Sequence, residues 1–457
     1  MHDVSSVSAL STALTIGFAI ALVASLLLKF WLATRQMRHV AQHRGAVPPA
    51  FADRISLAAH QKAADYTIAQ GRLGLLELAW GTALTLGWTL MGGLSALNQM
   101  LAQWLAPGIA QQVALLAAFA VIGAMIDLPF TLYRTFVLEQ RFGFNKTTAS
   151  LWLKDLLKST VLSIVIGLPL AALVLWMMGA TGALWWLWTW GVWMGFNLLV
   201  LLIYPTWIAP WFNQFKPLED PELKSRVTAL MARCGFQSKG FYVMDGSRRS
   251  AHANAYFTGF GASKRVVFYD TLLAQLNAAE VDAVLAHELG HFKHRHILKR
   301  IVAMFGMSLL GFAALGWLSQ QVWFYTGLGV SPNIWTPALG AAASSLPPEG
   351  AFAPWGGPAA LATAPNDALA LLLFMMVLPL VGTFVGPLFA QLSRKHEFEA
   401  DAFAVAQTSG SDLSSALLKL YQDNASTLTP DPVYVKFYYS HPPASERLGR
   451  MVQPAQA

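Results

Sequence analysis

The chain has 457 residues, of which 55% are apolar and only 12% charged, and its formal net charge is +7. Soluble globular proteins average about 25% charged residues, so this composition indicates a membrane protein. The single cysteine, Cys234, excludes an internal disulfide framework. The basic residues gather in loops between apolar runs, which fits the positive-inside rule better than nucleic-acid binding, so we expect no nucleic-acid partner.

About seven segments are long and apolar enough to cross a membrane, because a spanning helix needs roughly 20 mostly apolar residues. The first has no basic stretch before it, so we interpret it as an uncleaved span and not as a signal peptide. The predicted spans lie near residues 9–33, 73–101, 112–136, 159–178, 183–209, 301–325 and 367–391.

The loops between these spans alternate in charge. The loops near 102–111, 179–182 and 326–366 contain no Lys or Arg, whereas the others are basic. Because basic loops stay on the cytoplasmic side, the N-terminus is predicted to lie outside, with the C-terminus and both long basic segments inside. The loop 326–366 is rich in Pro, Gly and Ala, which predicts an irregular outside connector.

The chain is thus predicted to have four parts. Residues 210–300 should contain a helix over 219–235 and strands over 241–244 and 265–269, and residues 392–457 should be helical to about Gln422 and irregular after Asp423. These two segments are expected to fold together as one catalytic unit. The four parts are a membrane region at 1–209, a first catalytic segment at 210–300, two further spans at 301–391, and a second catalytic segment at 392–457.

Four acidic or amide side chains occur inside the apolar runs: Glu77, Asn98, Asp127 and Asn197. Such groups are costly in lipid, so they should face the bundle interior or water. Hydrogen bonds between helices would explain them. A polar cavity among the spans is the other explanation.

The stretch His287-Glu288-Leu289-Gly290-His291 predicts a metal site. Residues four positions apart share a helix face, so His287 and His291 can reach one ion. Zinc accepts imidazole nitrogen, and Glu288 lies beside the metal, where it can take a proton from bound water. We therefore predict a catalytic zinc with Glu288 as general base.

A catalytic zinc usually has three protein ligands and an open position. His294 and, less well, His296 are nearby candidates, but both belong to a basic cluster at the start of a predicted span. The distal candidate is Glu397, which shares a helix face with Asp401. One of these carboxylates can bind zinc while the other hydrogen-bonds a zinc-bound imidazole. Glu399 lies on a different face of that helix.

Several further motifs follow one another along the chain. They are RFGFNKT at 141–147, SAHANAYFTG at 250–259, HELGH at 287–291, EFEAD at 397–401, SHPP at 440–443 and ERL at 446–448. With these motifs the sequence resembles the CAAX prenyl protease 1 family, which are integral-membrane zinc endopeptidases of the zincin type. The resemblance covers most of the chain.

This resemblance implies a mainly α, polytopic membrane fold of about seven transmembrane helices enclosing a polar chamber. A zincin catalytic unit with a small β-sheet would lie on the cytoplasmic side. The resemblance also implies that Glu397 is the third ligand and Asp401 its supporting partner. Asn254 would bind substrate backbone, and His441, together with Arg447, would stabilise the oxyanion. About one zinc per chain is expected.

The expected function is hydrolysis of peptide bonds near the cytoplasmic membrane face. The substrate would be a peptide or protein segment, including one lipidated at its C-terminus, in contact with membrane lipids. The strand 265–269 is expected to offer its edge to an extended peptide. Two alternatives stay open: a general quality-control protease without prenylated substrates, and a metal transporter or channel without hydrolysis. The second is disfavoured because Glu288 is not a ligand.

Overall fold

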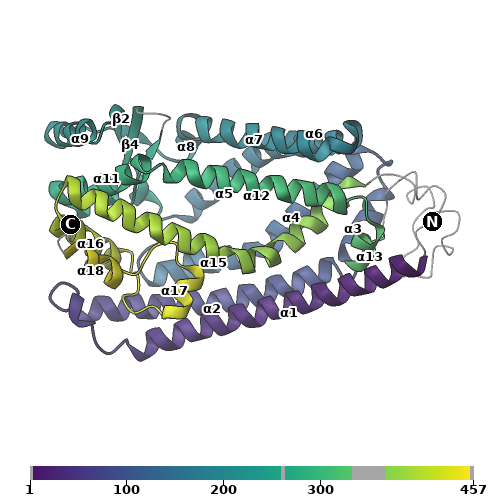
Figure 1. Cartoon of the computed structure of the whole chain (residues 1–457), viewed down its shortest axis with the longest axis horizontal. Helices are drawn as coiled ribbons and strands as arrows, with labels where there is room; N and C mark the ends of the chain where they lie inside the picture. Colours follow the sequence, from purple (N-terminus) through teal and green to yellow (C-terminus); the bar gives the residue numbers. More distant parts are fainter. Residues whose placement is uncertain (1–3, 259–262, 332–365, 453–457) are drawn as a thin grey trace.

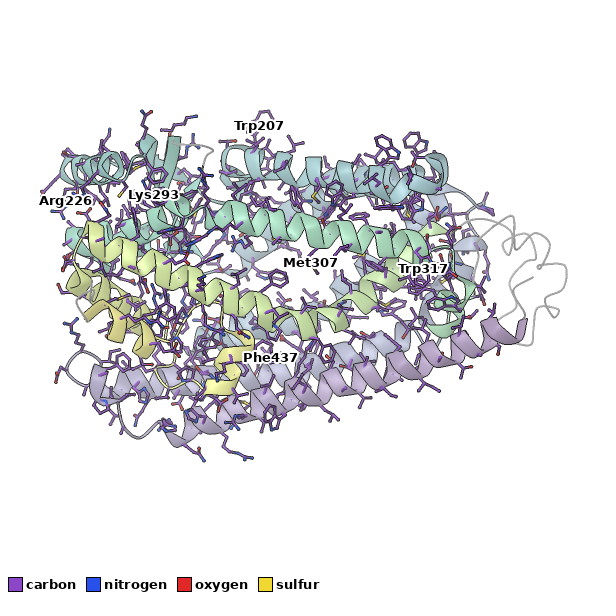
Figure 2. The ribbon with its side chains drawn as sticks, in the orientation of Figure 1. Trp207, Arg226, Lys293, Met307, Trp317 and Phe437 are labelled. Carbon is purple, nitrogen blue, oxygen red and sulfur yellow. The ribbon has the colours of Figure 1, made fainter. Side chains whose placement is uncertain are left out.

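Long helices run lengthwise through the molecule, and a small sheet with several shorter helices gathers at the end opposite the N-terminus (Figure 1). The computed structural model describes residues 4–258, 263–331 and 366–452. Most of the predicted connector 326–366 lies outside the described residues. Large apolar side chains such as Trp207, which is 75% exposed, point away from the helices, as expected for a surface that meets lipid (Figure 2).

Among the described residues, six helical segments are long and apolar enough to cross a membrane, and a bent pair makes a seventh. This number confirms the predicted mainly α, polytopic fold. The segments are α1 (Val4–Gln42); α4 (Ile109–Tyr133); α5 (Ala149–Leu162) with α6 (Leu168–Ala180); α7 (Trp185–Ile203) with α8 (Ala209–Phe212); α12 (His296–Leu318); α15 (Asp367–Gln407); and the bent pair α2 (Leu57–Trp88) and α3 (Gly93–Ala102).

Two of the predicted spans are interrupted. The prediction of one continuous span over 73–101 is wrong, because α2 and α3 are bent by 52° at a break. Gly92 has a φ of +81°, and a Cβ on Gly93 would lie 2.7 Å from the Gly87 carbonyl oxygen, so this turn requires glycine. The span over 301–325 also ends early, at Leu318, and a separate helix, α13 (Val322–Gly327), follows the polar Ser-Gln-Gln.

The sheet contains both predicted strands and two that were not predicted. Its order is β1 (Phe215–Pro217), β2 (Gln237–Met244), β4 (Ser263–Tyr269), β3 (Ala255–Thr258). β2 and β4 are parallel, and the other pairs are antiparallel. The prediction that 265–269 forms an edge is wrong, because Val267 pairs with both Tyr242 and Tyr256. Among the described strands β3 forms that edge instead.

One apolar core joins the sheet to helices from both predicted catalytic segments. The helices are α9 (Pro221–Arg233), α10 (Asp270–Gln275), α11 (Ala278–Lys293), α16 (Gly410–Asp423) and α18 (Ala444–Val452). Fully buried members include Val227, Phe268, Leu285 and Ala416, so residues far apart in sequence share one packing unit. The boundaries between the four predicted parts stay a prediction.

The C-terminal tail is helical where irregular structure was expected. α17 (Pro432–Tyr438) and α18 both follow Asp423, which contradicts that prediction. Asp431 caps α17 by accepting hydrogen bonds from the backbone of Val433 and Tyr434. Arg35 of α1 also donates to Asp431, at 2.9 Å, so the tail is tied to the first span.

Two of the polar groups in the spans connect helices. The Asn98 side-chain oxygen accepts from Gln111 at 2.7 Å and from Asn366 at 2.8 Å. Glu77 forms a charge-assisted pair with Arg134 at 2.6–2.7 Å. These contacts match the explanation by hydrogen bonds between helices. Asp127 and Asn197 are exposed.

The first motif of the family resemblance lies directly against the second. Asn145 forms a β-bridge with Ser250, and the ring of His252 stacks on Phe144 with centroids 4.5 Å apart. The loop after α4 therefore docks on the segment that leads into β3. This contact joins the N-terminal membrane helices to the sheet.

Candidate metal centre

Helix α11 carries the HELGH motif and is fixed at its start. Asn277 and Glu280 form a capping box, with hydrogen bonds of 2.8 and 3.0 Å between side chains and backbone. The Glu280 carboxylate also accepts from Ser415 and Lys419 of α16, each at 2.7 Å. The helix that positions the motif is therefore held against its neighbour.

Gly290 allows α11 to approach the C-terminal part of α15 closely. A Cβ on Gly290 would lie 3.0 Å from the Cα of Ala400, a separation that side chains rarely tolerate. The two helices meet at the end of the molecule that carries the sheet (Figure 1). Because their backbones are so close, Glu397 and Asp401 lie opposite His287.

His287, His291 and Glu397 form a compact cluster. The Nε2 atoms of His287 and His291 are 3.2 Å apart. The Glu397 carboxylate lies 3.4 Å from His287 Nε2 and 3.5 Å from His291 Nε2. Its Oε2 atom is buried and has no hydrogen-bond partner among the described residues. Two converging nitrogens and an unsatisfied carboxylate oxygen fit a bound metal cation.

Asp401 contacts the His287 ring on the side away from this cluster. Its Oδ1 lies 2.8 Å from His287 Nδ1. Arg447 of α18 donates to both Asp401 oxygens, at 2.8 and 2.6 Å, in a buried bidentate pair. The structure thus brings Arg447 to Asp401, and its predicted role at the oxyanion stays a prediction.

His441 and Asn254 lie at more open positions. His441 Nε2 is 3.3 Å from Glu397 Oε1, and its side chain is 64% exposed. Asn254 is exposed immediately before β3, and its Oδ1 accepts from the backbone of Ala255 at 2.8 Å. His441 therefore adjoins the cluster, whereas Asn254 marks the start of the edge strand.

The alternative ligands after α11 are separated from the cluster. His294 is exposed, and its ring stacks on that of His296 at 5.5 Å. His296 is buried and lies between His291 and Glu399, with nitrogen and oxygen contacts of 3.1 and 2.8 Å. Sequence reasoning assigned these histidines to a basic membrane boundary. The signal that it missed is the position of His296 just beyond the end of α11, close enough to contact His291.

Burial and neighbouring charges shift the titration of the motif residues. Burial raises the pKa of the Glu288 carboxyl above its ordinary range, and the nearby Glu397 adds to this. Burial and the charge of His287 lower the pKa of His291 to about 4. Burial also opposes protonation of His287, but the adjacent carboxylates of Asp401 and Glu397 outweigh it and raise the pKa to about 9.

Comparison with known proteins matches this arrangement along nearly the whole chain. Residues 36–214 match the CAAX prenyl protease N-terminal model with five membrane helices, and residues 217–455 match peptidase family M48. CAAX prenyl protease 1 of Saccharomyces cerevisiae is 35% identical over 347 residues, covering 74% of this chain and 72% of that protein. The Arabidopsis thaliana homologue is 34% identical over 341 residues, covering 74% and 73%.

A solved structure has the same fold. The crystal structure of S. mikatae Ste24p superposes with a TM-score of 0.85 at 29% identity, covering 96% of this chain and 99% of that chain. The family resemblance and the prediction of a hydrolytic enzyme are thereby confirmed, in contrast to a metal transporter or channel. The chain belongs to peptidase family M48 and is a multi-pass membrane metalloprotease that resembles CAAX prenyl protease 1.

Proposed function

We propose that the metal is zinc, about one ion per chain, held by His287 Nε2, His291 Nε2 and the Glu397 carboxylate. The observation that carries this proposal is the buried Glu397 Oε2, which has no hydrogen-bond partner in the described part of the chain and lies 3.4 Å from an imidazole nitrogen. Two nitrogens and one carboxylate match the ligands of catalytic zinc sites, which keep a further position open.

Side chains of the protein then have separate roles in peptide hydrolysis. The bound zinc supplies Lewis acidity toward the scissile carbonyl and its water. Glu288 accepts a proton from the attacking water and returns it to the leaving amine. His441, next to Glu397, donates a hydrogen bond to the carbonyl oxygen as negative charge develops. Asp401 keeps the proton of His287 on Nδ1, so that Nε2 is free for the metal.

We propose that substrate binds as an added strand along β3. This strand is the edge next to β4, and Asn254 lies at its start, where an amide side chain can hold a substrate backbone group. The ring of Phe257 contacts Phe292 of α11, with centroids 5.9 Å apart, so the edge is packed beside the motif helix. A peptide bound there would be extended and unfolded, with little sequence demand.

The membrane helices support a polar chamber that opens near the cytoplasmic face. Only 6% of the most apolar window of α12, and of the α4 segment, is buried within the protein. Helices of a tightly packed bundle would bury more, so this low burial is consistent with a wet interior. The basic loops support the cytoplasmic side. The relatives named CAAX prenyl proteases support a C-terminally lipidated substrate.

The test uses purified protein prepared without chelator. We expect about one zinc per chain by elemental analysis, because three ligands and one open position complete the site. A strong chelator should stop cleavage of a prenylated C-terminal peptide, and zinc should restore it. Activity that persists in chelator, with no transition metal bound, would contradict the proposal. Equal cleavage of an unlipidated, unfolded peptide would instead favour the quality-control alternative.

Asp401→Ala should weaken zinc binding by about 10- to 100-fold, because His287 would lose the carboxylate that fixes its orientation. Arg447 would also keep a buried charge without its bidentate partner. Competition with a chromogenic chelator measures the dissociation constant. The exposed Glu222→Ala on α9 is the control and should bind zinc like the wild type. Unchanged affinity in Asp401→Ala would refute the supporting role.

A further inference from the structure

The His291 ring also has a hydrogen-bond partner on the side away from the cluster, His296, which in turn contacts Glu399. These two residues have no role in the proposed chemistry. We propose that His296 and Glu399 form a hydrogen-bond relay that positions His291 for the metal, as Asp401 positions His287. Both are positioning residues, since neither faces the cluster itself. This inference rests on the proposed metal site.

The hydrogen-bond donors of the relay follow from its geometry. His291 Nε2 faces the cluster, 3.2 Å from His287 Nε2, so a metal there requires the ring proton on Nδ1. His291 Nδ1 lies 3.1 Å from His296 Nδ1, which must accept this proton. The proton of His296 is then on Nε2, 2.8 Å from Glu399 Oε2. Each ring is therefore held in one tautomer, and the series of hydrogen bonds ends at the Glu399 carboxylate.

A strained turn makes this contact possible. α11 ends at Lys293, and α12 begins at His296 after Arg295, whose φ of 56° is left-handed. For a residue other than glycine this conformation is unfavourable. The turn folds the first residue of α12 back against the motif helix, where His296 is only 4% exposed. Strain of this kind persists where surrounding contacts require it.

The two supports differ in burial, which sets their expected strength. The Asp401 side chain is 5% exposed and is held by Arg447. The Glu399 side chain is 33% exposed and has a distant ion pair with Lys395, at 3.9 Å. The relay should therefore contribute less to metal affinity than Asp401 does, since a solvated carboxylate polarises its partner less.

A second cation bound by His296, His396 and Glu399 is the competing interpretation, because their ligand atoms lie within 4.8 Å of one another. The rings of His296 and His396 are stacked, with centroids 4.0 Å apart and planes only 9° from parallel. Ring nitrogens in parallel planes do not point at one ion. His296 Nδ1 is also within hydrogen-bond distance of His291, which is not part of this group. The geometry thus favours the relay.

Three variants test the relay in the full chain. His296→Leu removes the hydrogen bonds and keeps an apolar side chain, His296→Gln keeps one acceptor and one donor, and His294→Leu is the matched control. We expect His296→Leu to weaken zinc binding by about 10-fold and to change the visible spectrum of the Co(II)-substituted protein. His296→Gln should recover part of both properties. His294→Leu should match the wild type, because that ring contacts the rings of His296 and Phe403 and lies outside the relay.

A double-mutant cycle then asks whether the two residues act in series. Glu399→Ala should cost less zinc affinity than His296→Leu, and the double variant no more than His296→Leu alone. Additive losses would overturn the relay, as would wild-type affinity and Co(II) spectrum in both His296 variants. A second bound ion that disappears in His396→Leu would overturn it too. Wild-type protein without any bound metal would contradict the proposed site itself.

Discussion

Replacing Glu288 with glutamine is expected to abolish peptide hydrolysis while leaving the metal in place. The substitution keeps the shape of the side chain but removes its ability to accept a proton from water. General base catalysis contributes about 10²- to 10⁴-fold to rates, so the kcat of the variant should be lower than that of the wild type by a factor in this range. Single-turnover cleavage of a peptide, together with elemental analysis of the same sample, measures both properties.

The matched control is Glu222→Gln, at an exposed glutamate of α9 outside the site. It should cleave like the wild type. Burial raises the pKa of the Glu288 carboxyl, which is the environment expected of a base that must exchange a proton near neutral pH. Cleavage by Glu288→Gln at near wild-type rate would show that another group accepts the proton.

Glu397→Ala is expected to remove most of the metal from the protein. Loss of a supporting residue costs about 10- to 100-fold in affinity, and loss of a direct ligand should exceed that range. The Nε2 atoms of His287 and His291 would also lose the only carboxylate placed between them within the described structure. Chelator competition on purified protein measures the zinc dissociation constant.

Glu399→Ala, two residues further along α15, serves as the comparison. Its carboxylate contacts His296 and not the cluster, so its effect should be the smaller of the two by at least about 10-fold. Similar losses in Glu397→Ala and Glu399→Ala would mean that the two carboxylates are not separated by helix face. The third ligand would then have to be sought elsewhere.

Helical periodicity was enough to place His287 and His291 on one face and to pair Glu397 with Asp401. These predictions depend only on spacing within a helix, which local sequence determines. The choice of Glu397 over His294 came from comparing sequence contexts and stays a prediction. In the structure His294 is exposed, whereas Glu397 is buried beside His287 and His291.

Contacts between distant segments were not predictable in the same way. The partner of Asp401 is Arg447, which lies on α18. This helix was not predicted from the sequence, because two prolines precede it. The sequence analysis assigned no role to Gly290, whose importance is the close approach of α11 to the backbone of another helix near Ala400. The edge strand β3 was missed because it is only four residues long. Pairing and packing decide these features, and neither has a periodic signal.

The length of α15 connects the proposed metal ligand Glu397 to the membrane-spanning part of the same helix. This single helix begins at Asp367 in the apolar region and continues through Glu397. Pro387 lies within it, about 15 Å from Glu397 at roughly 1.5 Å per residue. A tilt of about 4° at that proline would move the ligand by about 1 Å, and displacements of that size can cost about 100-fold in rate. The apolar span and the proposed ligand Glu397 therefore belong to one continuous helix, so a change in the tilt of the span would move Glu397 relative to α11.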